Sequence, residues 1–187
     1  MKAGLAPGEA VYFLDARHPT RATKIGYSWS LRGGRKAIKT WAGQERVNVV
    51  GSLDPATLRL VTTFPAKVNG ASLSKHLAKL RRLSKTDAKI HVILDNGSYC
   101  RSHAARGAAA ALGIERVHLP PYSPNLNLIE RMWRLMNERV RDNVSFPSAK
   151  AFEDAIKKFF QKRWPRISKN FKSRFAENFQ SCRQVSF

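Results

Sequence analysis

Three acidic residues have the types and spacing of a metal-dependent phosphoryl-transfer site. Asp15 ends the apolar run at 11–15, and Asp95 follows a second apolar run. Glu130 lies in the first turn of a predicted helix that follows a third predicted strand. Apolar runs that end in an acid predict buried strands, and functional groups collect at the carboxyl edge of such sheets. Carboxylates gathered there repel one another unless a divalent cation lies between them. The acids therefore predict two bound Mg²⁺ or Mn²⁺ ions that activate a water or 3′-hydroxyl toward a phosphodiester.

Each acid also has a simpler interpretation. Asp15 is a residue type that often begins a turn after a strand. The sequence DNG at 95–97 has the composition of a tight turn. Asn127 and Glu130 have the spacing of the N-cap and N3 positions of a capping box at a helix start. Both interpretations stay open for each acid, and the metal site rests on all three occurring together.

The charge of the chain indicates a polyanionic partner. The 187 residues include 34 Lys and Arg against 13 Asp and Glu, which gives a formal net charge of +21. Such an excess repels itself in a compact state unless a polyanion neutralises it. Nucleic acid is the commonest such partner, because basic side chains release counterions from phosphates. A ribosome-like structural protein is the alternative that charge alone leaves open.

The remaining composition argues against several other classes of protein. Cys100 and Cys182 form no CxxC pair, and the five histidines show no HExxH arrangement, so no zinc site is indicated. The N-terminus lacks the apolar core of a signal peptide. No apolar run approaches the roughly 18 residues that span a bilayer. We therefore expect a cytoplasmic protein without a membrane partner.

The acids are expected to lie on a sheet flanked by helices. Strand candidates occur at 11–15, 24–30, 37–43, 47–54, 57–64, 89–96 and 116–119. Gly, Asp and Pro between the early candidates predict an antiparallel meander, and the continuous apolar character of 89–96 predicts a central strand. Helices are expected at 71–83, 102–112, 128–141, from Ser148 onward, and at 167–179. The predicted class is α/β or α+β with a mixed sheet.

Several sequence blocks resemble one family of transposases. The stretch LPPYSPNLNLIERMW at 119–133 resembles the LPPYSP-x-LNPIE-x-x-W block of mariner-superfamily insertion-sequence transposases, of the bacterial IS six-thirty group. Thirty-four residues separate Asp95 from Glu130, which is the D-34-E spacing that this superfamily often shows. The blocks at 13–33 and 93–102 resemble those around the first and second aspartates of the family. The segment 136–156 resembles its C-terminal helices.

This resemblance implies a fold and a reaction. The implied fold is RNase H-like: a five-stranded mixed sheet whose first three strands are antiparallel, with helices on both faces. Asp15, Asp95 and Glu130 would bind two Mg²⁺ or Mn²⁺ ions. The implied reaction frees a 3′-hydroxyl at a transposon end and joins it to target DNA, typically at a TA dinucleotide. A homodimer on DNA and a nucleoid-associated, bacterial location are also implied.

Two departures from the family pattern bear on this chain. Leu128 stands where the family has proline, a position at which proline preorganises the first helical turn, so we expect the geometry to survive. Family members usually carry a helix-turn-helix domain, and the fourteen residues before Asp15 are too few for one. We therefore expect a lead-in at 1–10 and a catalytic domain at 11–187, with C-terminal helices at about 148–187 and no helix-turn-helix domain.

The predicted function is a DNA strand-transferase domain. The alternative is a truncated or inactive remnant that keeps only DNA binding. A third hypothesis is a Holliday-junction or RNA–DNA nuclease on the same scaffold, against which the PPYSP sequence argues.

Basic residues near the acids are candidates for DNA contact. The candidates are Arg32, Arg35, Lys36, Arg101, Arg131 and Arg134. The first three lie in the turn RGGRK, which we interpret as a phosphate-contacting hairpin, with a solvated surface turn as the alternative. The other three flank the acids in sequence and are candidates for holding the scissile strand, or else are exposed or ion-paired residues.

Polar and aromatic residues beside the acids complete the predictions. Asn96 and Tyr122 are neighbours of the acids in sequence and are expected to orient a ligand or water. Trp29, Trp41 and Trp133 are interpreted as packing residues rather than as platforms on which bases stack.

Overall fold

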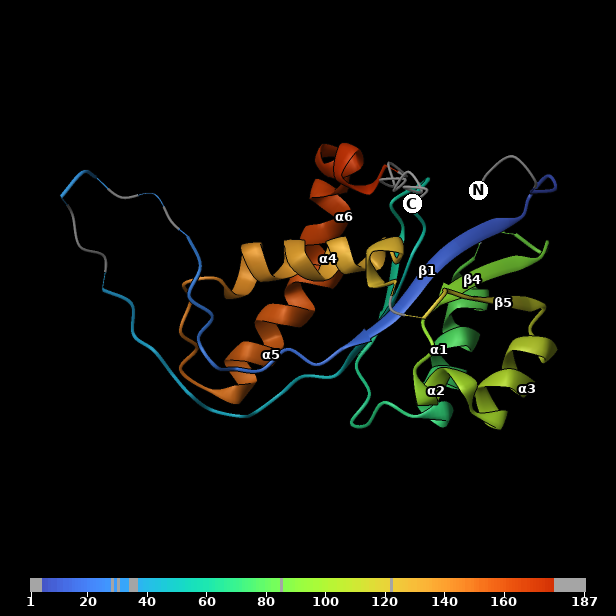
Figure 1. Ribbon diagram of the computed structural model, residues 1–187, viewed down its shortest axis with the longest axis horizontal. Helices are drawn as coiled ribbons and strands as arrows, with labels where there is room; N and C mark the ends of the chain where they lie inside the picture. Colours follow the sequence, from blue (N-terminus) through green and yellow to red (C-terminus); the bar gives the residue numbers. More distant parts are fainter. Residues whose placement is uncertain are drawn as a thin grey trace, which may run out of the picture.

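Five strands form one mixed sheet. The structure is a computed structural model that describes residues 5–27, 29, 31–33, 37–84, 86–121 and 123–176. The strands are β1 (Ala10–Arg17), β2 (Val49–Leu53), β3 (Leu60–Thr63), β4 (Ile90–Leu94) and β5 (Ile114–His118). Their order is β3-β2-β1-β4-β5 (Figure 1). β1, β2 and β3 pair antiparallel, whereas β4 runs parallel to β1 and β5. The predicted mixed sheet with three antiparallel strands first is confirmed.

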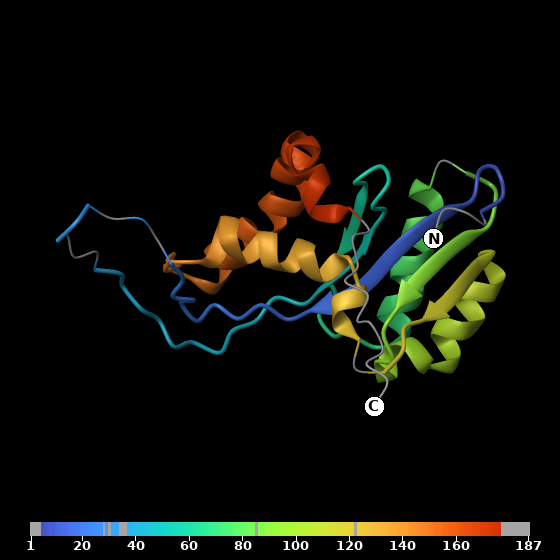
Figure 2. The same ribbon diagram turned by 45° about the horizontal axis from the view of Figure 1, so that its top comes forward.

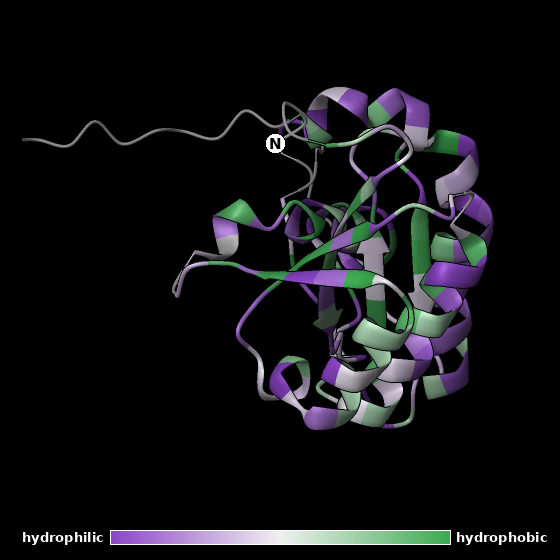
Figure 3. Cartoon of the chain, turned by 90° about the vertical axis from the view of Figure 1, so that its right-hand side faces the viewer, coloured by the Kyte–Doolittle hydropathy of each residue, from purple (hydrophilic) through white to green (hydrophobic). Residues whose placement is uncertain are grey.

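Helices cover both faces of this sheet (Figures 1 and 2). One group comprises α1 (Gly70–Leu83), α2 (Ser98–Arg101) and α3 (His103–Ala111). The other comprises α4 (Ile129–Met136), α5 (Ala149–Lys158) and α6 (Trp164–Ile167), with the 3₁₀ helices η2 (Pro124–Leu126) and η5 (Ser168–Phe175) and the π-helices η3 (Asn137–Arg141) and η4 (Phe159–Arg163). In Figure 3 the helices alternate between hydrophilic and hydrophobic residues, as helices with one face on a sheet do.

Alternate residues of β1 pack into two separate cores. Tyr12 and Leu14 face the core that contains Leu73 of α1, and Phe13 faces the core that contains Trp133 of α4. This alternation follows from the two-residue period of a strand. A central strand buried on both faces therefore connects the two halves of the molecule, and β4 has the same environment.

Helices lie at the positions predicted for 71–83, 102–112, 128–141 and from Ser148 onward. α3 ends before Gly113, whose φ of +61° suits the end of a helix. The Ser148 hydroxyl accepts a hydrogen bond from the Ala151 N–H and caps α5. Part of the helix predicted at 167–179 lies outside the described residues, and most of the rest is the 3₁₀ helix η5, which follows α6. Among the helices in the described ranges, none has the length and apolarity that crossing a bilayer requires.

The two strands predicted at 24–30 and 37–43 are wrong. Their described residues lie in an extended arm between β1 and β2 that projects from the body of the molecule (Figure 1). The bridges of the described arm are isolated pairs, Thr20 with Arg46 and Lys24 with Asp142. Strand-forming side chains need a neighbouring strand and a core to pack against, and local sequence does not report whether these exist.

Trp29 and Trp41 lie on this arm, and the prediction that Trp29 is a packing residue is also wrong, whereas Trp41 packs against Arg21 outside the two cores. Trp29 is fully exposed and Trp41 is 46% exposed, with the Arg21 guanidinium 4.4 Å from the ring centre of Trp41. The arm leaves the sheet before either ring can reach a core. Trp133, by contrast, is buried as predicted.

Gly51 in β2 gives Trp133 the room that it occupies. A Cβ added at Gly51 would lie 2.8 Å from the Trp133 ring and 2.9 Å from Ile129 Cδ1. Gly51→Ala should therefore lower the free energy of unfolding by about 1–3 kcal/mol, the usual cost of overpacking a core, as measured by urea denaturation. Gly107→Ala in α3 is the matched control, because no described atom beyond the local helix backbone lies within 4 Å of its added Cβ. The control should raise stability by about 0.5–1 kcal/mol. Equal stabilities of the two variants would contradict this account.

Candidate active site

The register of two parallel strands places Asp15 beside Asp95. Leu14 of β1 is aligned with Leu94 of β4, so the residues that follow are neighbours at the same edge of the sheet. Asp15 is buried, with 6% of its surface exposed, and Asp95 is half-buried. The two acids that end apolar runs in the sequence are thus brought together by strand pairing alone.

The connection after β5 brings Glu130 to the same edge. The Leu119 N–H donates to the Leu94 carbonyl at 2.9 Å, and the chain then returns through η2 to the first turn of α4. The Asn127 amide Nδ2 donates to the Leu14 carbonyl at 3.2 Å, which ties the start of α4 to β1 next to Asp15. The side chain of Glu130 is 34% exposed.

The capping-box interpretation of Asn127 and Glu130 is wrong. The N-cap residue of α4 is Leu128, and no side chain caps this helix. The Glu130 N–H instead donates to the backbone carbonyl of Asn127 at 3.0 Å. Neither Asn127 nor Glu130 therefore acts as a side-chain cap of α4.

The three acids line one cavity of about 340 Å³. The other lining residues are Asn96, Arg101, Leu119, Pro120, Pro121, Ser123 and Asn127. The Arg101 guanidinium donates to Asn96 Oδ1 at 2.9 Å, and Asn96 Nδ2 donates to the Leu119 carbonyl at 2.8 Å. Asn96 is therefore fixed by its own bonds, and it in turn orients the Arg101 guanidinium, which also lines the cavity.

The carboxyl group of Asp15 is the most perturbed of the three. Burial, and then the charges of Glu130 and Asp95, raise its pKa to about 7. The Trp133 indole opposes this by donating a hydrogen bond to Asp15 Oδ2 at 2.8 Å. The Tyr99 hydroxyl lies 3.5 Å from Oδ1. A cation in the cavity would favour the ionised form of this carboxyl.

Asp95 is oriented by two donors on one oxygen. The Gly97 N–H approaches Asp95 Oδ1 at 3.0 Å and the Cys100 thiol approaches it at 3.6 Å. Burial, and then the charge of Asp95, raise the pKa of the Cys100 thiol to about 12, so the thiol stays protonated at neutral pH. Cys100 is thus a weak donor to the acid and not a nucleophile.

The other residues predicted to contact DNA are scattered. Arg32 is exposed on the arm and Arg134 is exposed on α4. Arg131 donates to the backbone carbonyls of Arg174 and Ala176 at 2.9 and 2.8 Å, so its charge is turned toward the C-terminal segment. Arg35, Lys36 and Tyr122 lie outside the described residues.

Sequence reasoning missed Arg17 and the roles of Trp133 and Asn127 at the site. Arg17 Nη1 lies 3.8 Å from Glu130 Oε2, and its position two residues after Asp15 on a strand was the available signal. Trp133 lies three residues after Glu130, the spacing of neighbours on one helix face. Asn127 was considered only as a cap.

The cavity offers oxygen ligands of the kind that Mg²⁺ and Mn²⁺ prefer. Three carboxylates line it, and Asn127 Oδ1 is buried there with no hydrogen-bond partner in the part of the chain that the structure describes. Among the described residues, no three His, Cys, Asp or Glu side chains are grouped closely enough to hold one ion. The donor chemistry therefore fits a divalent cation, although the carboxylates share a cavity and do not form a closed cage.

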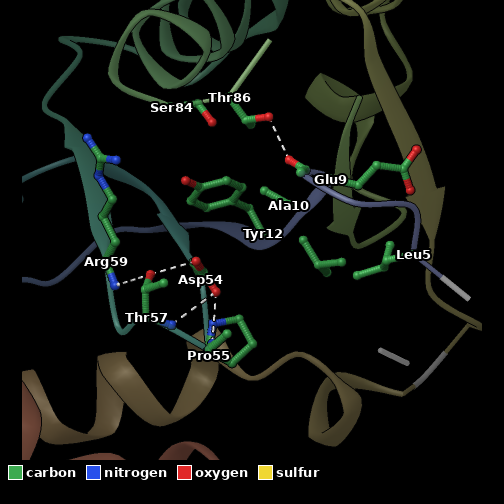
Figure 4. Close-up of a pocket in the computed structure, with 13 residues that line it drawn as sticks. Leu5, Glu9, Ala10, Tyr12, Asp54, Pro55, Thr57, Arg59, Ser84 and Thr86 are labelled. Carbon is green, nitrogen blue, oxygen red and sulfur yellow. Dashed lines mark hydrogen bonds between the residues drawn. The ribbon is translucent and has the colours of Figure 1, made fainter. Parts of the chain in front are cut away.

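A larger cavity, of about 1000 Å³, lies near the start of β1 (Figure 4). Its acids are Glu9 and Asp54, and Asp54 accepts hydrogen bonds from the Thr57 hydroxyl at 2.6 Å and the Ala56 N–H at 2.8 Å. None of the three predicted acids lines this cavity. Its size alone does not make it the candidate for phosphoryl transfer.

Comparison with known proteins places the chain in a family. The model of a family described as DDE superfamily endonuclease matches residues 10–153, a range that includes all three acids. The chain belongs to this family. DDE endonucleases generally use divalent metal ions, which agrees with the oxygen-rich lining of the cavity.

Individual relatives agree with this assignment. The chain is 26% identical over 121 residues to the "Insertion element IS630 uncharacterized 39 kDa protein" of Shigella sonnei, in a match that covers 64% of this chain and 35% of that protein. The match to the protein of the Mos1 strand transfer complex covers 89% of this chain and 52% of the Mos1 chain, with a TM-score of 0.61 and 17% identity. The match to the catalytic core domain of BIV integrase covers 82% of this chain and 85% of the integrase chain, with a TM-score of 0.52 and 15% identity. The fold is therefore RNase H-like, as the sequence resemblance implied. The chain spans about a third of the curated relative.

Replacement of Trp133 by Phe should raise the pKa of Asp15 further, because the variant loses the indole N–H that lowers it. The pKa is measured from the side-chain carboxyl signal of Asp15 in an NMR titration. Trp164→Phe is the matched control, since Trp164 is equally buried and its indole donates to the Leu58 carbonyl at 3.1 Å, outside the cavity. Each variant should lose about 1–3 kcal/mol of stability. An Asp15 pKa that moves equally in both variants would contradict a specific role for Trp133.

The pKa of Asp15 also predicts how stability depends on pH. Between the ordinary value of 3.8 and the folded value of about 7, the folded protein holds a proton that the unfolded chain has released. The stabilisation from Asp15 is therefore present at low pH and is lost as pH rises through this window. In metal-free buffer, the wild-type protein should lose stability relative to Asp15→Asn between pH 5 and pH 8, as measured by urea denaturation. Parallel curves for the two proteins would refute the assigned pKa.

Proposed function

We propose that this chain is the catalytic domain of a DNA transposase that cuts and joins DNA strands with the help of divalent cations. The observation that carries the proposal is the shared cavity of Asp15, Asp95 and Glu130 in a chain of the DDE endonuclease family. The Mos1 neighbour was solved as a strand transfer complex, which supports strand joining as the second step.

The three acids would hold two Mg²⁺ or Mn²⁺ ions. When bound, such ions activate a water or 3′-hydroxyl and stabilise the leaving oxygen of the phosphodiester. The two aspartates are fixed by the sheet, and Glu130 is supplied by a helix tied to β1 through Asn127. Arg101 provides a positive charge at the cavity wall that suits a phosphate of the bound strand.

DNA is the proposed partner, as transposon ends and as target. The net charge of +21 supports it. Arg32 and Arg134 are exposed and suited to phosphate contact. A homodimer on DNA, a nucleoid-associated location and the division into a lead-in at 1–10 and a catalytic domain at 11–187 remain predictions.

The test is plasmid nicking in the presence of Mn²⁺. Asp95→Asn should lower the nicking rate at least about 100-fold, the range for loss of one preorganised electrostatic group. Asp154→Asn is the matched control, because it removes the same charge from an exposed position on α5. This control should nick at the wild-type rate.

Two results would overturn the proposal. Equal nicking by the wild type and Asp95→Asn would show that the acid cavity is not the catalytic site. DNA binding by the wild type without any nicking would assign the chain to the alternative, a remnant that only binds DNA.

A further inference from the structure

The side chain of Asn127 is a buried polar group at the acid cavity that the three-acid site does not account for. Asn127 is 3% exposed and lines the cavity. Its Nδ2 donates to the Leu14 carbonyl at 3.2 Å, and its Oδ1 is buried without a hydrogen-bond partner among the described residues. Buried amide oxygens in folded proteins nearly always have a partner, which is often a water or an ion.

The orientation of this amide is fixed by chemistry. A backbone carbonyl only accepts hydrogen bonds, so Nδ2 must face Leu14, and exchange of the two ends would set two acceptors against each other. Oδ1 is therefore the end that remains for a ligand of the cavity.

Several other asparagines among the described residues have their amide oxygens paired. Asn69 Oδ1 accepts from the Ser72 N–H at 2.9 Å, Asn96 Oδ1 accepts from Arg101, and Asn143 Oδ1 accepts from the Gly26 N–H at 3.0 Å. The free oxygen of Asn127 is thus not a general feature of the asparagines in this fold. It also does not cap α4, because no side chain does.

We infer that Asn127 Oδ1 is a neutral oxygen donor to a divalent cation bound on the Asp15–Glu130 side of the cavity. Asn127 bonds to the backbone next to Asp15 and precedes Glu130 by one turn of chain, which assigns it to that side. A neutral donor adds a ligand without another negative charge between acids that already repel each other. This inference rests on the proposed function, because it assumes that the acids bind the cation.

The test measures Mn²⁺ binding by isothermal titration calorimetry at pH 8 without DNA. Asn127→Ala removes both ends of the amide and should weaken Mn²⁺ binding about tenfold or more, as loss of a group that supports a metal site does. Asn127→Asp keeps an oxygen at the Oδ1 position but loses the Nδ2 donor to Leu14. It should bind Mn²⁺ at least as tightly as the wild type, because its carboxylate is also a cation ligand.

Controls separate ligand binding from stability. Asn69→Ala removes an asparagine that caps α1 away from the cavity, so it should lower the metal-free melting temperature without changing Mn²⁺ affinity. Equal weakening of Mn²⁺ binding by Asn127→Ala and Asn127→Asp would overturn the inference, because the two variants share only the lost bond to Leu14. Should Asn127→Ala not fold, Asn127→Asp decides alone, and weaker binding than the wild type overturns the inference.

The outcomes also distinguish this inference from the proposed function. Absence of Mn²⁺ binding by the wild type would refute the metal site itself, and the inference with it. Binding by the wild type that Asn127→Ala leaves unchanged would refute the role of Asn127 and leave the three-acid site standing.

Discussion

The buried carboxyl group of Asp15 is the constraint on which the site and much of the packing depend. It lies on a central strand between two apolar cores, where an ionised group is unfavourable without a partner. The indole N–H of Trp133 is that partner. Trp133 can approach Asp15 because Gly51, on the neighbouring strand β2, has no side chain that would occupy the space of the ring. The same ring packs edge-on against Phe160, so the hydrogen bond to Asp15 also anchors the C-terminal helices to the sheet. One polar contact thus links the chemistry of the acid to the assembly of the second core.

Much of the sheet was predictable because its information is local. The runs at 11–15 and 89–96 are apolar over their whole length and end in an acid, and a parallel register then sets the two aspartates side by side. The arm shows the limit of such reasoning. Its residues at 24–30 and 37–43 have strand-like composition, but pairing depends on whether a partner strand lies beside them. No property of the arm's own sequence reports that.

The acids of the candidate site could be predicted from the sequence. The residues that position those acids could not. Asn127 and Glu130 have the spacing of a capping box, and that spacing is the same whether the asparagine caps the helix or faces a ligand. The direction of Asn127 Oδ1 is set by the Leu14 carbonyl, because Asn127 Nδ2 donates its hydrogen bond to that carbonyl. Trp133 could be assigned to the same helix face as Glu130, but its bond to an acid 118 residues earlier could not be read from either segment.

Leu128, which stands where the resembled transposase block has proline, fits this division between scaffold and chemistry. Leu128 has φ −61°, which is the angle that a proline ring would impose, and its side chain is fully buried in the core beneath α4. The residue therefore replaces a backbone restraint with a packing restraint and keeps the first turn of the helix in place. Because Asp15 and Asp95 are fixed by strand pairing, the position of Glu130 is set by this turn, by the Asn127 tether and by Trp133. The geometry of the third acid is thus a property of how α4 docks on the sheet, and changes in that docking act on the site without touching a carboxylate.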